Sequence, residues 1–234
     1  MRLTIANKNY SSWSLRPWLL MQMLGLPFEE RLLPFASAVD GPAYAGQTPN
    51  GRVPCLEDGE LIVWDSLAIV EYIAELAPQA WPAERAARAW ARSACAEMHA
   101  GFGHIRGVCT MNCGLRVKVR DWTPALLAEW ARMDALWCEG LRRFGGPFLA
   151  GSAFTAVDAF FAPVALRVQS YTPALSPAAQ AYAQHLLALP PLQAWYQAAL
   201  LEPWRDPPHE AEAQAGGEWL QDLRVPSTPS RLQP

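Results

Sequence analysis

The sequence lacks the features that mark a membrane, secreted or metal-binding protein. It has no apolar run near the roughly 20 residues that cross a bilayer, and the opening run MRLTIANKNY lacks the apolar centre of a secretory signal. Its five cysteines form no CxxC pair and no Cys/His cluster with zinc-like spacing. We therefore expect a cytoplasmic protein with reduced thiols, no metal site and no membrane partner.

Positive charge is also scarce. The formal net charge is −3, and the 19 lysines and arginines are scattered rather than grouped into a basic patch, so we expect no nucleic-acid partner. By contrast, 51% of the 234 residues are hydrophobic, which is enough for a buried core in one large domain or two modest ones. The 11 tryptophans suit a helical core or a pocket for flat apolar ligands.

The first eighty residues mix strand-like and helix-like patterns. An Asp58-Gly59 turn joins two short apolar runs into a predicted hairpin, and Ser66 is the predicted N-cap of the helix that follows. A polar, proline-bearing stretch at residues 40–51 precedes the hairpin and is predicted to be irregular. The predicted elements are a strand at 3–6 (LTIA), a helix at 15–24, a strand at 29–35 (EERLLPF), the hairpin VPCLED and ELIVW, and the helix SLAIVEYIAEL.

The remainder of the chain shows only helical periodicity. A proline-bearing break at residues 77–82 separates the two compositions and predicts a linker. We expect helices at 84 to about 106, 123–144, 155–170, 177–189 and 190–200. The predicted domains are therefore 1–78, a helical domain at 83–202, and a partly irregular C-terminal extension at 203–234.

Four motifs in this order resemble those of the glutathione transferase family. SSWSLR (11–16) is similar to the serine-type stretch at the start of the first helix, closest to the zeta class, and GRVPCLED (51–58) resembles the segment that holds a cis-proline. WDSLAIVEYI (64–73) resembles the stretch that holds the γ-glutamyl end of glutathione, and GSAFTAVDAFFAP (151–163) resembles the N-capping box of the helical domain. The resemblance covers about residues 1–200.

The resemblance implies an α/β N-terminal thioredoxin-like domain followed by an all-α C-terminal helical domain. It implies a cytosolic glutathione S-transferase that takes glutathione as co-substrate, conjugates or reduces small hydrophobic electrophiles, serves detoxification and forms a homodimer. Two alternatives stay open. The zeta-like SSWSLR suggests glutathione-dependent cis–trans isomerisation, although Trp13 replaces the cysteine of that motif. The fold also occurs in non-catalytic binding or scaffold modules.

A hydroxyl at the start of the first helix would favour the thiolate of glutathione. A hydrogen bond from a hydroxyl and the positive end of a helix both stabilise an anion. Alignment of Arg16 with the family's arginine puts Ser11 at the thiolate position, with Ser12 beside it and Tyr10 as the rival. Ser11, Ser12 or Ser14 could instead only cap the helix. Because no cysteine precedes Cys55, mixed-disulfide chemistry through this position is excluded.

The resemblance also implies how glutathione is held. A cis Val53–Pro54 bond would present the Val53 backbone to the cysteinyl part of the tripeptide, and Arg52 would meet the glycine carboxylate. Asp65 would pair with the α-ammonium, while Ser66 would donate to the carboxylate beside it. Each of these features has a structural alternative: a trans proline that opens an edge strand, a solvated arginine, and a simple helix cap.

The second substrate is expected to lie against the helical domain, because the first helix of that domain borders the cleft in this family. The same side chains could instead belong to the core. Thr155 and Asp158 are expected to form a reciprocal helix cap with no catalytic role. The candidates for the acceptor pocket are Trp13, Met98, Phe102, Arg106, Met111 and Asn112.

Overall fold

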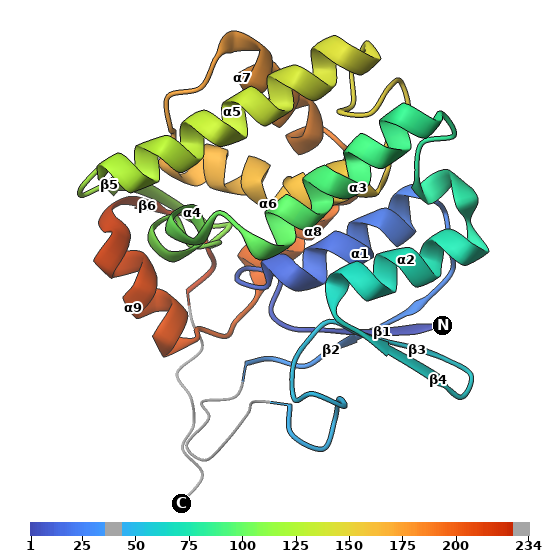
Figure 1. Ribbon diagram of the computed structural model, residues 1–234. Helices are drawn as coiled ribbons and strands as arrows, with labels where there is room; N and C mark the ends of the chain where they lie inside the picture. Colours follow the sequence, from blue (N-terminus) through green and yellow to red (C-terminus); the bar gives the residue numbers. More distant parts are fainter. Residues whose placement is uncertain (36–43, 227–234) are drawn as a thin grey trace, which may run out of the picture.

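The first part of the chain folds into a four-stranded sheet with two helices on one face (Figure 1). The strand order is β2-β1-β3-β4, with β1 parallel to β2 and the other neighbours antiparallel. The computed structural model describes residues 1–35 and 44–226, so residues 40–43 of the predicted irregular segment lie outside the described residues. The elements are β1 (Arg2–Ile5), α1 (Ser12–Met23), β2 (Glu29–Leu32), β3 (Cys55–Asp58), β4 (Leu61–Trp64) and α2 (Ser66–Leu76).

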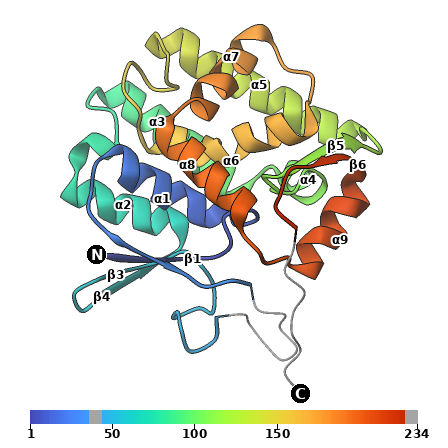
Figure 2. The ribbon, with the colours of Figure 1, turned by 180° about the vertical axis from the view of Figure 1, so that it is seen from behind.

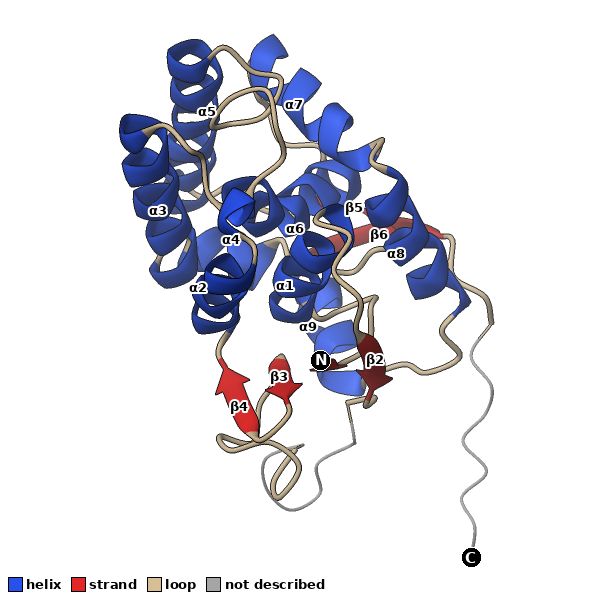
Figure 3. Cartoon of the chain, turned by 90° about the vertical axis from the view of Figure 1, so that its right-hand side faces the viewer, coloured by secondary structure: helices blue, strands red, loops and turns tan. Residues whose placement is uncertain are grey.

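The second part is a helical layer that stands over these two helices, so that the sheet forms one end of the molecule (Figure 3). A short 3₁₀ turn, η1 (Pro78–Ala80), lies within the predicted linker. The predicted fold class, a thioredoxin-like domain followed by a helical domain, is confirmed. The helices are α3 (Arg85–Ala100), α4 (Gly103–Val108), α5 (Pro124–Phe144), α6 (Ala156–Tyr171), α7 (Pro177–Leu187) and α8 (Pro190–Leu201).

A two-stranded ribbon departs from the prediction that strands stop before the helical domain. β5 (Leu115–Val119) pairs antiparallel with β6 (Gly217–Asp222), and α9 (Pro207–Gly216) leads into β6. Figure 1 shows α9 and this ribbon side by side at one edge of the helical layer. The C-terminal extension is thus built into the molecule as far as the described residues reach, and residues 227–234 lie outside them.

Two predicted helix boundaries are wrong. The single helix expected from Glu84 to about Arg106 is two helices, because Gly101 is extended and Phe102 adopts a left-handed conformation with φ 57°. The N-cap of α2 is Asp65 rather than Ser66, since the Asp65 carboxylate accepts a hydrogen bond from the Leu67 N–H at 2.8 Å.

The two domains share one core, in which α6 is the central helix. Its residues from Ala156 to Val168 are all buried, because α1, α3 and α7 pack around it. α8 lies against α1 on the far side (Figure 2). The predicted capping box at the start of α6 is confirmed: the Thr155 N–H donates to the Asp158 carboxylate at 2.9 Å. This packing fixes the start of α1 against the helical domain.

Candidate active site

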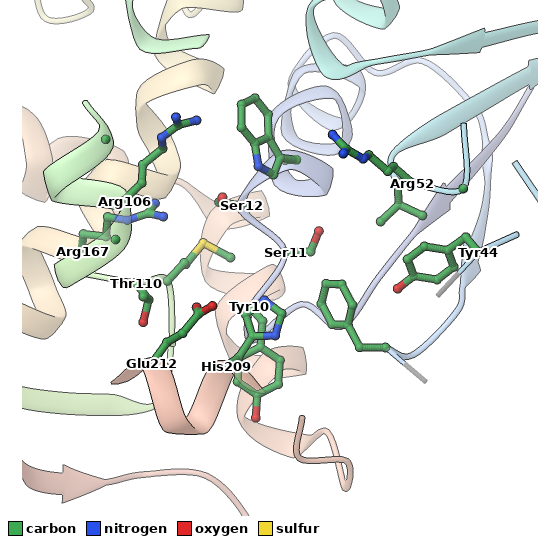
Figure 4. A pocket seen from close by; sticks show the side chains of 17 residues that line it. Tyr10, Ser11, Ser12, Tyr44, Arg52, Arg106, Thr110, Arg167, His209 and Glu212 are labelled. Carbon is green, nitrogen blue, oxygen red and sulfur yellow. The ribbon is translucent and has the colours of Figure 1, made fainter. Parts of the chain in front are cut away.

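A cavity of about 640 Å³ opens between the two domains at the start of α1 (Figure 4). Its wall on the sheet side comes from the β1–α1 loop and from the loop before β3. The opposite wall comes from α4, the segment after it, α6 and α9. Its lining residues are Tyr10, Ser11, Ser12, Trp13, Phe35, Tyr44, Gly51, Arg52, Val53, Gly103, Arg106, Gly107, Thr110, Met111, Arg167, His209 and Glu212.

Ser11 joins the cavity to the N-terminus of α1. Its Oγ accepts a hydrogen bond from the Ser14 N–H at 3.4 Å and is the N-cap of the helix. Its Oγ is also 2.7 Å from the Ser14 Oγ, which in turn accepts the Ala6 N–H at 3.2 Å. In this pair the Ser11 hydroxyl donates to the Ser14 Oγ. Because hydroxyl protons rotate, the Ser11 proton can turn from Ser14 toward a ligand.

Tyr10 and Ser12 flank Ser11 but differ in what holds them. The Tyr10 hydroxyl donates to Glu210 at 2.7 Å and lies 3.3 Å from Arg224, so it points toward α9 and away from the two serines (Figure 4). Burial, followed by the hydrogen bond to Glu210, raises the pKa of this phenol. Ser12 is the first residue of α1 and lines the cavity directly.

A second hollow of about 340 Å³ adjoins the first at Trp13, Arg52, Val53 and Arg106. The Val53–Pro54 peptide bond is cis, and both residues line the hollow. Ser66 lines it as well. The Ser66 Oγ is buried and has no hydrogen-bond partner in the part of the chain that is described. Since a buried hydroxyl is rarely left unpaired, this atom points to a ligand as its partner.

Asp65 is held at the edge of the second hollow in an unusual backbone conformation. Its φ of 73° lies in the left-handed region, which a residue other than glycine adopts at a cost of about 1–3 kcal/mol. One carboxylate oxygen caps α2, and the other lies 3.5 Å from the His99 Nε2. Burial lowers the pKa of His99 even though Asp65 opposes that shift. Because the Asp65 carboxylate is exposed and lines the second hollow, it can meet a cationic group on a ligand.

Three arginines lie on or beneath the helical side of the main cavity. The guanidinium carbon of Arg16 is 4.1 Å from the centre of the Trp13 ring, and that of Arg106 is 5.4 Å from the same ring. Burial is the largest cause that lowers the pKa of Arg16 to about 9 and of Arg167 to about 10. Arg16 and Arg167 both remain cations at neutral pH.

The structure brings most of the predicted site residues to the two hollows and leaves three outside their lining. Met98, Phe102 and Asn112 are buried and line neither hollow. The break between α3 and α4 turns the chain at Phe102. The Asn112 side chain accepts a hydrogen bond from the Asn9 amide and donates one to Glu210. The predicted residues that line at least one hollow are Tyr10, Ser11, Ser12, Trp13, Arg52, Val53, Pro54, Asp65, Ser66, Arg106 and Met111.

Several residues that line the main cavity are not among the predicted site residues. His209 and Glu212 come from α9, in the extension where no helix was expected. The His209 ring stacks on Tyr10 at 5.1 Å between ring centres and also packs on Phe35. Arg167 is a cation within the apolar run of α6, and that isolated charge was the one signal in the sequence that could have revealed it.

Neither metal nor thiol chemistry has support at this site. All five cysteines are free, and burial raises the pKa of Cys109 to about 11 and also raises that of Cys55. Within residues 1–35 and 44–226, no group of three or more metal-ligating side chains comes together. Over the same described ranges, no helix is both long and apolar enough to cross a membrane.

Comparison with known proteins decides the family. Residues 10–76 match the family model of the glutathione S-transferase N-terminal domain, and residues 120–198 match that of the C-terminal domain. The chain belongs to the glutathione transferase family. It is 27% identical over 177 residues to the glutathione S-transferase-like protein OpS6 of Beauveria bassiana, an alignment that covers 70% of this chain and 79% of that protein.

Solved structures of glutathione transferases share the fold. One neighbour is a glutathione transferase homolog from Burkholderia with bound glutathione, with a TM-score of 0.65, 20% identity, and coverage of 85% of this chain and 97% of that one. Another is a theta class glutathione S-transferase from Xanthomonas axonopodis pv. citri with glutathione bound. Its TM-score is 0.60, its identity 25%, and the match covers 83% of this chain and 96% of that one.

Proposed function

We propose that this family member is a glutathione S-transferase of the serine type. It binds glutathione across the two hollows, stabilises the thiolate with the Ser11 hydroxyl, and adds that thiolate to a small electrophile with an apolar body. The observation that carries the proposal is the buried Ser66 Oγ, which has no partner among the described residues and opens on the same connected space as Ser11. Support also comes from the neighbours of this fold that hold glutathione.

Glutathione binding follows from the chemistry of the second hollow. The γ-glutamyl carboxylate would accept the Ser66 hydroxyl and the backbone N–H groups at the start of α2, and the α-ammonium would meet the exposed Asp65. The Val53 backbone would pair with the cysteinyl residue, and Arg52 would meet the glycine carboxylate. In this pose the sulfur points toward the start of α1.

Thiolate stabilisation at α1 is energetically adequate. Lowering a thiol pKa from ~8.5 by two units needs about 2.7 kcal/mol. One hydroxyl that donates to a charged acceptor contributes about 1.5–3 kcal/mol, and a helix N-terminus adds about 0.3–2 kcal/mol. Ser11 combines both effects if its proton turns from Ser14 to the sulfur. Ser12 is the nearest alternative donor, whereas the Tyr10 hydroxyl is already committed to Glu210.

The main cavity would hold the electrophile against Trp13 and Met111. In a substitution, the sulfur–carbon bond forms while the bond from carbon to the leaving group breaks, and the leaving group takes the electron pair. The thiol proton has already gone to solvent. No metal or nucleotide takes part in this proposal. As in other members of the family, we expect a two-fold homodimer in the cytoplasm and a role in detoxification.

Isomerisation is the second candidate, because SSWSLR resembles the zeta-class motif. A cis–trans isomerase would add the thiolate to an activated double bond, allow rotation and expel the thiolate again. Rapid turnover of a maleyl-type substrate, together with little conjugate formed from haloarenes, would favour this reading. A non-catalytic binding module would retain glutathione on a resin without turnover of any electrophile.

The test compares single hydroxyl deletions in the purified protein. We expect binding to a glutathione resin and turnover of at least one activated haloarene, isothiocyanate or hydroperoxide. Ser11→Ala should lose more than about tenfold in kcat with little change in the Kd for glutathione. Tyr10→Phe is the matched control, because it removes a hydroxyl that points away from the serines. Full activity in Ser11→Ala with collapse in Ser12→Ala would transfer the role to Ser12.

A further inference from the structure

Arg167 is fixed in the wall of the main cavity with one nitrogen left over. The side chain is 4% exposed, its Nε donates to the Cys109 carbonyl at 2.7 Å, and its Nη1 donates to the Pro163 carbonyl at 3.2 Å. These two bonds fix the plane of the guanidinium group. Nη2 finds no acceptor among the residues that the structure describes, so it is the group left to bind a ligand.

Arg106 lies beside Arg167 on the same wall (Figure 4). Its Nε is buried and has no hydrogen-bond partner in the described chain, and its guanidinium group packs on Trp13. Behind both, the fully buried Arg16 has an unpartnered Nε and Nη1 and is enclosed by the Trp13 and Phe160 rings. Two guanidinium groups thus line the cavity wall, and a third is buried behind them.

No carboxylate of residues 1–35 or 44–226 forms an ion pair with any of these three arginines. Of the two carboxylates that line the hollows, Asp65 caps α2 and faces His99, and Glu212 is an exposed residue of α9. Buried cations without a partner are costly, so native proteins pair them or supply an anion from a ligand. An anion placed between Arg106 and Arg167 would satisfy both.

We propose that the electrophile of this enzyme carries a carboxylate, which Arg106 and Nη2 of Arg167 bind while its apolar body lies on Trp13. This inference rests on the proposed transferase function and narrows its substrate class. Glutathione itself does not account for the pair, because its two carboxylates are assigned to Ser66 and Arg52. In Figure 4, Arg52 lies across the cavity from Arg106 and Arg167.

Two benzylic halides test the proposal, since they differ only at a position remote from the reacting carbon. The glutathione sulfur attacks the CH₂ group of 4-(bromomethyl)benzoate or of its methyl ester, the carbon–bromine bond breaks, and bromide leaves with the electron pair. With each kcat/KM divided by the uncatalysed rate, we expect the wild-type protein to prefer the carboxylate more than about tenfold. Equal values, or a preference for the ester, would overturn the proposal.

Substitution of Arg106 tests whether this residue causes the preference for the carboxylate substrate. Arg106→Gln should reduce the carboxylate-to-ester ratio by at least about fivefold, and Arg106→Lys should restore part of it because the charge returns without the planar fork. Arg142→Gln is the matched control, because Arg142 is exposed on α5 and lines neither hollow. If Arg106→Gln instead raises the KM for glutathione and leaves the ratio unchanged, the arginine holds glutathione and the proposal fails.

A binding measurement separates this inference from the proposed function. Calorimetry with the unreactive 4-methylbenzoate, in the presence of glutathione, should show binding that 4-methylbenzamide lacks and that Arg106→Gln weakens at least fivefold. If the protein binds glutathione and turns over electrophiles but does not distinguish acid from amide, only the carboxylate proposal is wrong. If it neither binds glutathione nor turns over any electrophile, the proposed function itself fails.

Discussion

Ser11 combines a structural and a chemical task in one hydroxyl. As the N-cap of α1 it satisfies the Ser14 N–H, and as the proposed donor it must also reach the sulfur. Its oxygen accepts while its proton donates, so both tasks are possible at once. In the structure this proton is donated to the Ser14 Oγ at 2.7 Å, so it must turn from Ser14 to the sulfur when glutathione binds.

Two substitutions of Ser11 separate these tasks. Replacing an N-cap serine with alanine costs about 1 kcal/mol, whereas glycine costs only a few tenths. Ser11→Ala and Ser11→Gly should therefore lose turnover equally, while only Ser11→Ala lowers the free energy of unfolding by about 1 kcal/mol in urea denaturation. Near-normal turnover in Ser11→Gly would mean that the loss in Ser11→Ala came from the helix start and not from the hydroxyl.

Glu202 connects the end of α8 to the loop before α1, and we expect it to make the stability of the fold depend on pH. Its carboxylate accepts the Lys8 and Asn9 N–H groups at 2.6 and 3.1 Å, yet burial outweighs these bonds and raises its pKa to about 7 from the ordinary 4.5. A carboxyl group with a raised pKa binds more protons in the folded state. Stability is therefore greatest below about pH 4.5 for this group and falls as the pH rises toward 7.

The size of this effect is bounded by the shift itself. A change from 4.5 to about 7 corresponds to about 3 kcal/mol at most. Urea denaturation at several pH values should show stability falling across this window, and Glu202→Gln should flatten that slope. If Glu202→Gln shows the same fall of stability with pH as the wild-type protein, the pH dependence comes from another group.

At the scale of elements, periodicity alone identifies most of the fold. The sheet, α1 and α2 follow from alternating and 3.6-residue patterns, and α5 begins and ends within a residue of its predicted bounds. The break after α3 was missed because Gly101 and Phe102 sit inside an otherwise helical pattern. The left-handed Phe102 is imposed by tertiary packing rather than by its own preference.

The sequence carries a weak pattern for β5 but no local pattern for its pairing with β6. In LRVKV the first, third and fifth residues are buried and the others are not, a two-residue alternation that was available but short. Its partner β6 comes about a hundred residues later. At the turn from α9 into β6, a Cβ on Gly217 would lie 2.3 Å from the Lys118 carbonyl oxygen. Such a close approach becomes visible only when both strands are in place.

As with the fold, the sequence identifies part of the candidate site and misses the part that depends on tertiary packing. The SSWSLR and DS motifs led to Ser11, Ser12, Asp65 and Ser66, which the structure brings to connected hollows. His209 and Glu212 could not be inferred, because their place depends on how α9 docks and not on any local pattern. The contact of Ser11 with the thiolate stays a prediction, as do the domain boundaries and the homodimer.

Arg224 holds α9 and β6 together through ion pairs. Its side chain is 1% exposed, it binds Glu210 through both terminal nitrogens at 2.6 and 2.9 Å, and it also binds Asp222. Removing one partner of a buried pair costs about 3–5 kcal/mol locally, because the other charge is left unpaired. Arg224→Ala should therefore loosen α9 and β6 and open the cavity wall at His209.

Hydrogen exchange measures this loosening. We expect amide exchange in residues 207–222 to accelerate more than about tenfold in Arg224→Ala, with smaller changes in α5. Arg120→Ala is the matched control, since Arg120 is exposed and its side chain makes one hydrogen bond with this segment, to the Gln214 carbonyl at 3.2 Å, while its backbone bond to Gly216 stays in the variant. Unchanged exchange in α9 would mean that the apolar contacts alone hold the segment.

On the scale of the whole molecule, the site exists because two domains share a core. The sheet domain contributes the serines and the glutathione-binding edge, while α4, α6 and α9 contribute the opposite wall. The packing of α1 on α6 sets the distance between these walls. Buried contacts of this kind make two domains unfold as one cooperative unit, whereas a small polar interface would let them unfold separately.

Phe160 tests this cooperativity because it lies on α6 at the domain junction. The side chain is fully buried, and its ring centre is 4.6 Å from the Arg16 guanidinium carbon on α1. Phe160→Ala should lower the free energy of unfolding by about 3–5 kcal/mol through the cavity it leaves. Denaturation should stay a single transition, and amide exchange in α1 should accelerate together with that in α6. Leu127→Ala, on the exposed face of α5 with 49% exposure, should change little. Two separate transitions, or α1 exchange unaffected by the loss of Phe160, would show that the sheet domain holds its serines in place without help from the helical domain.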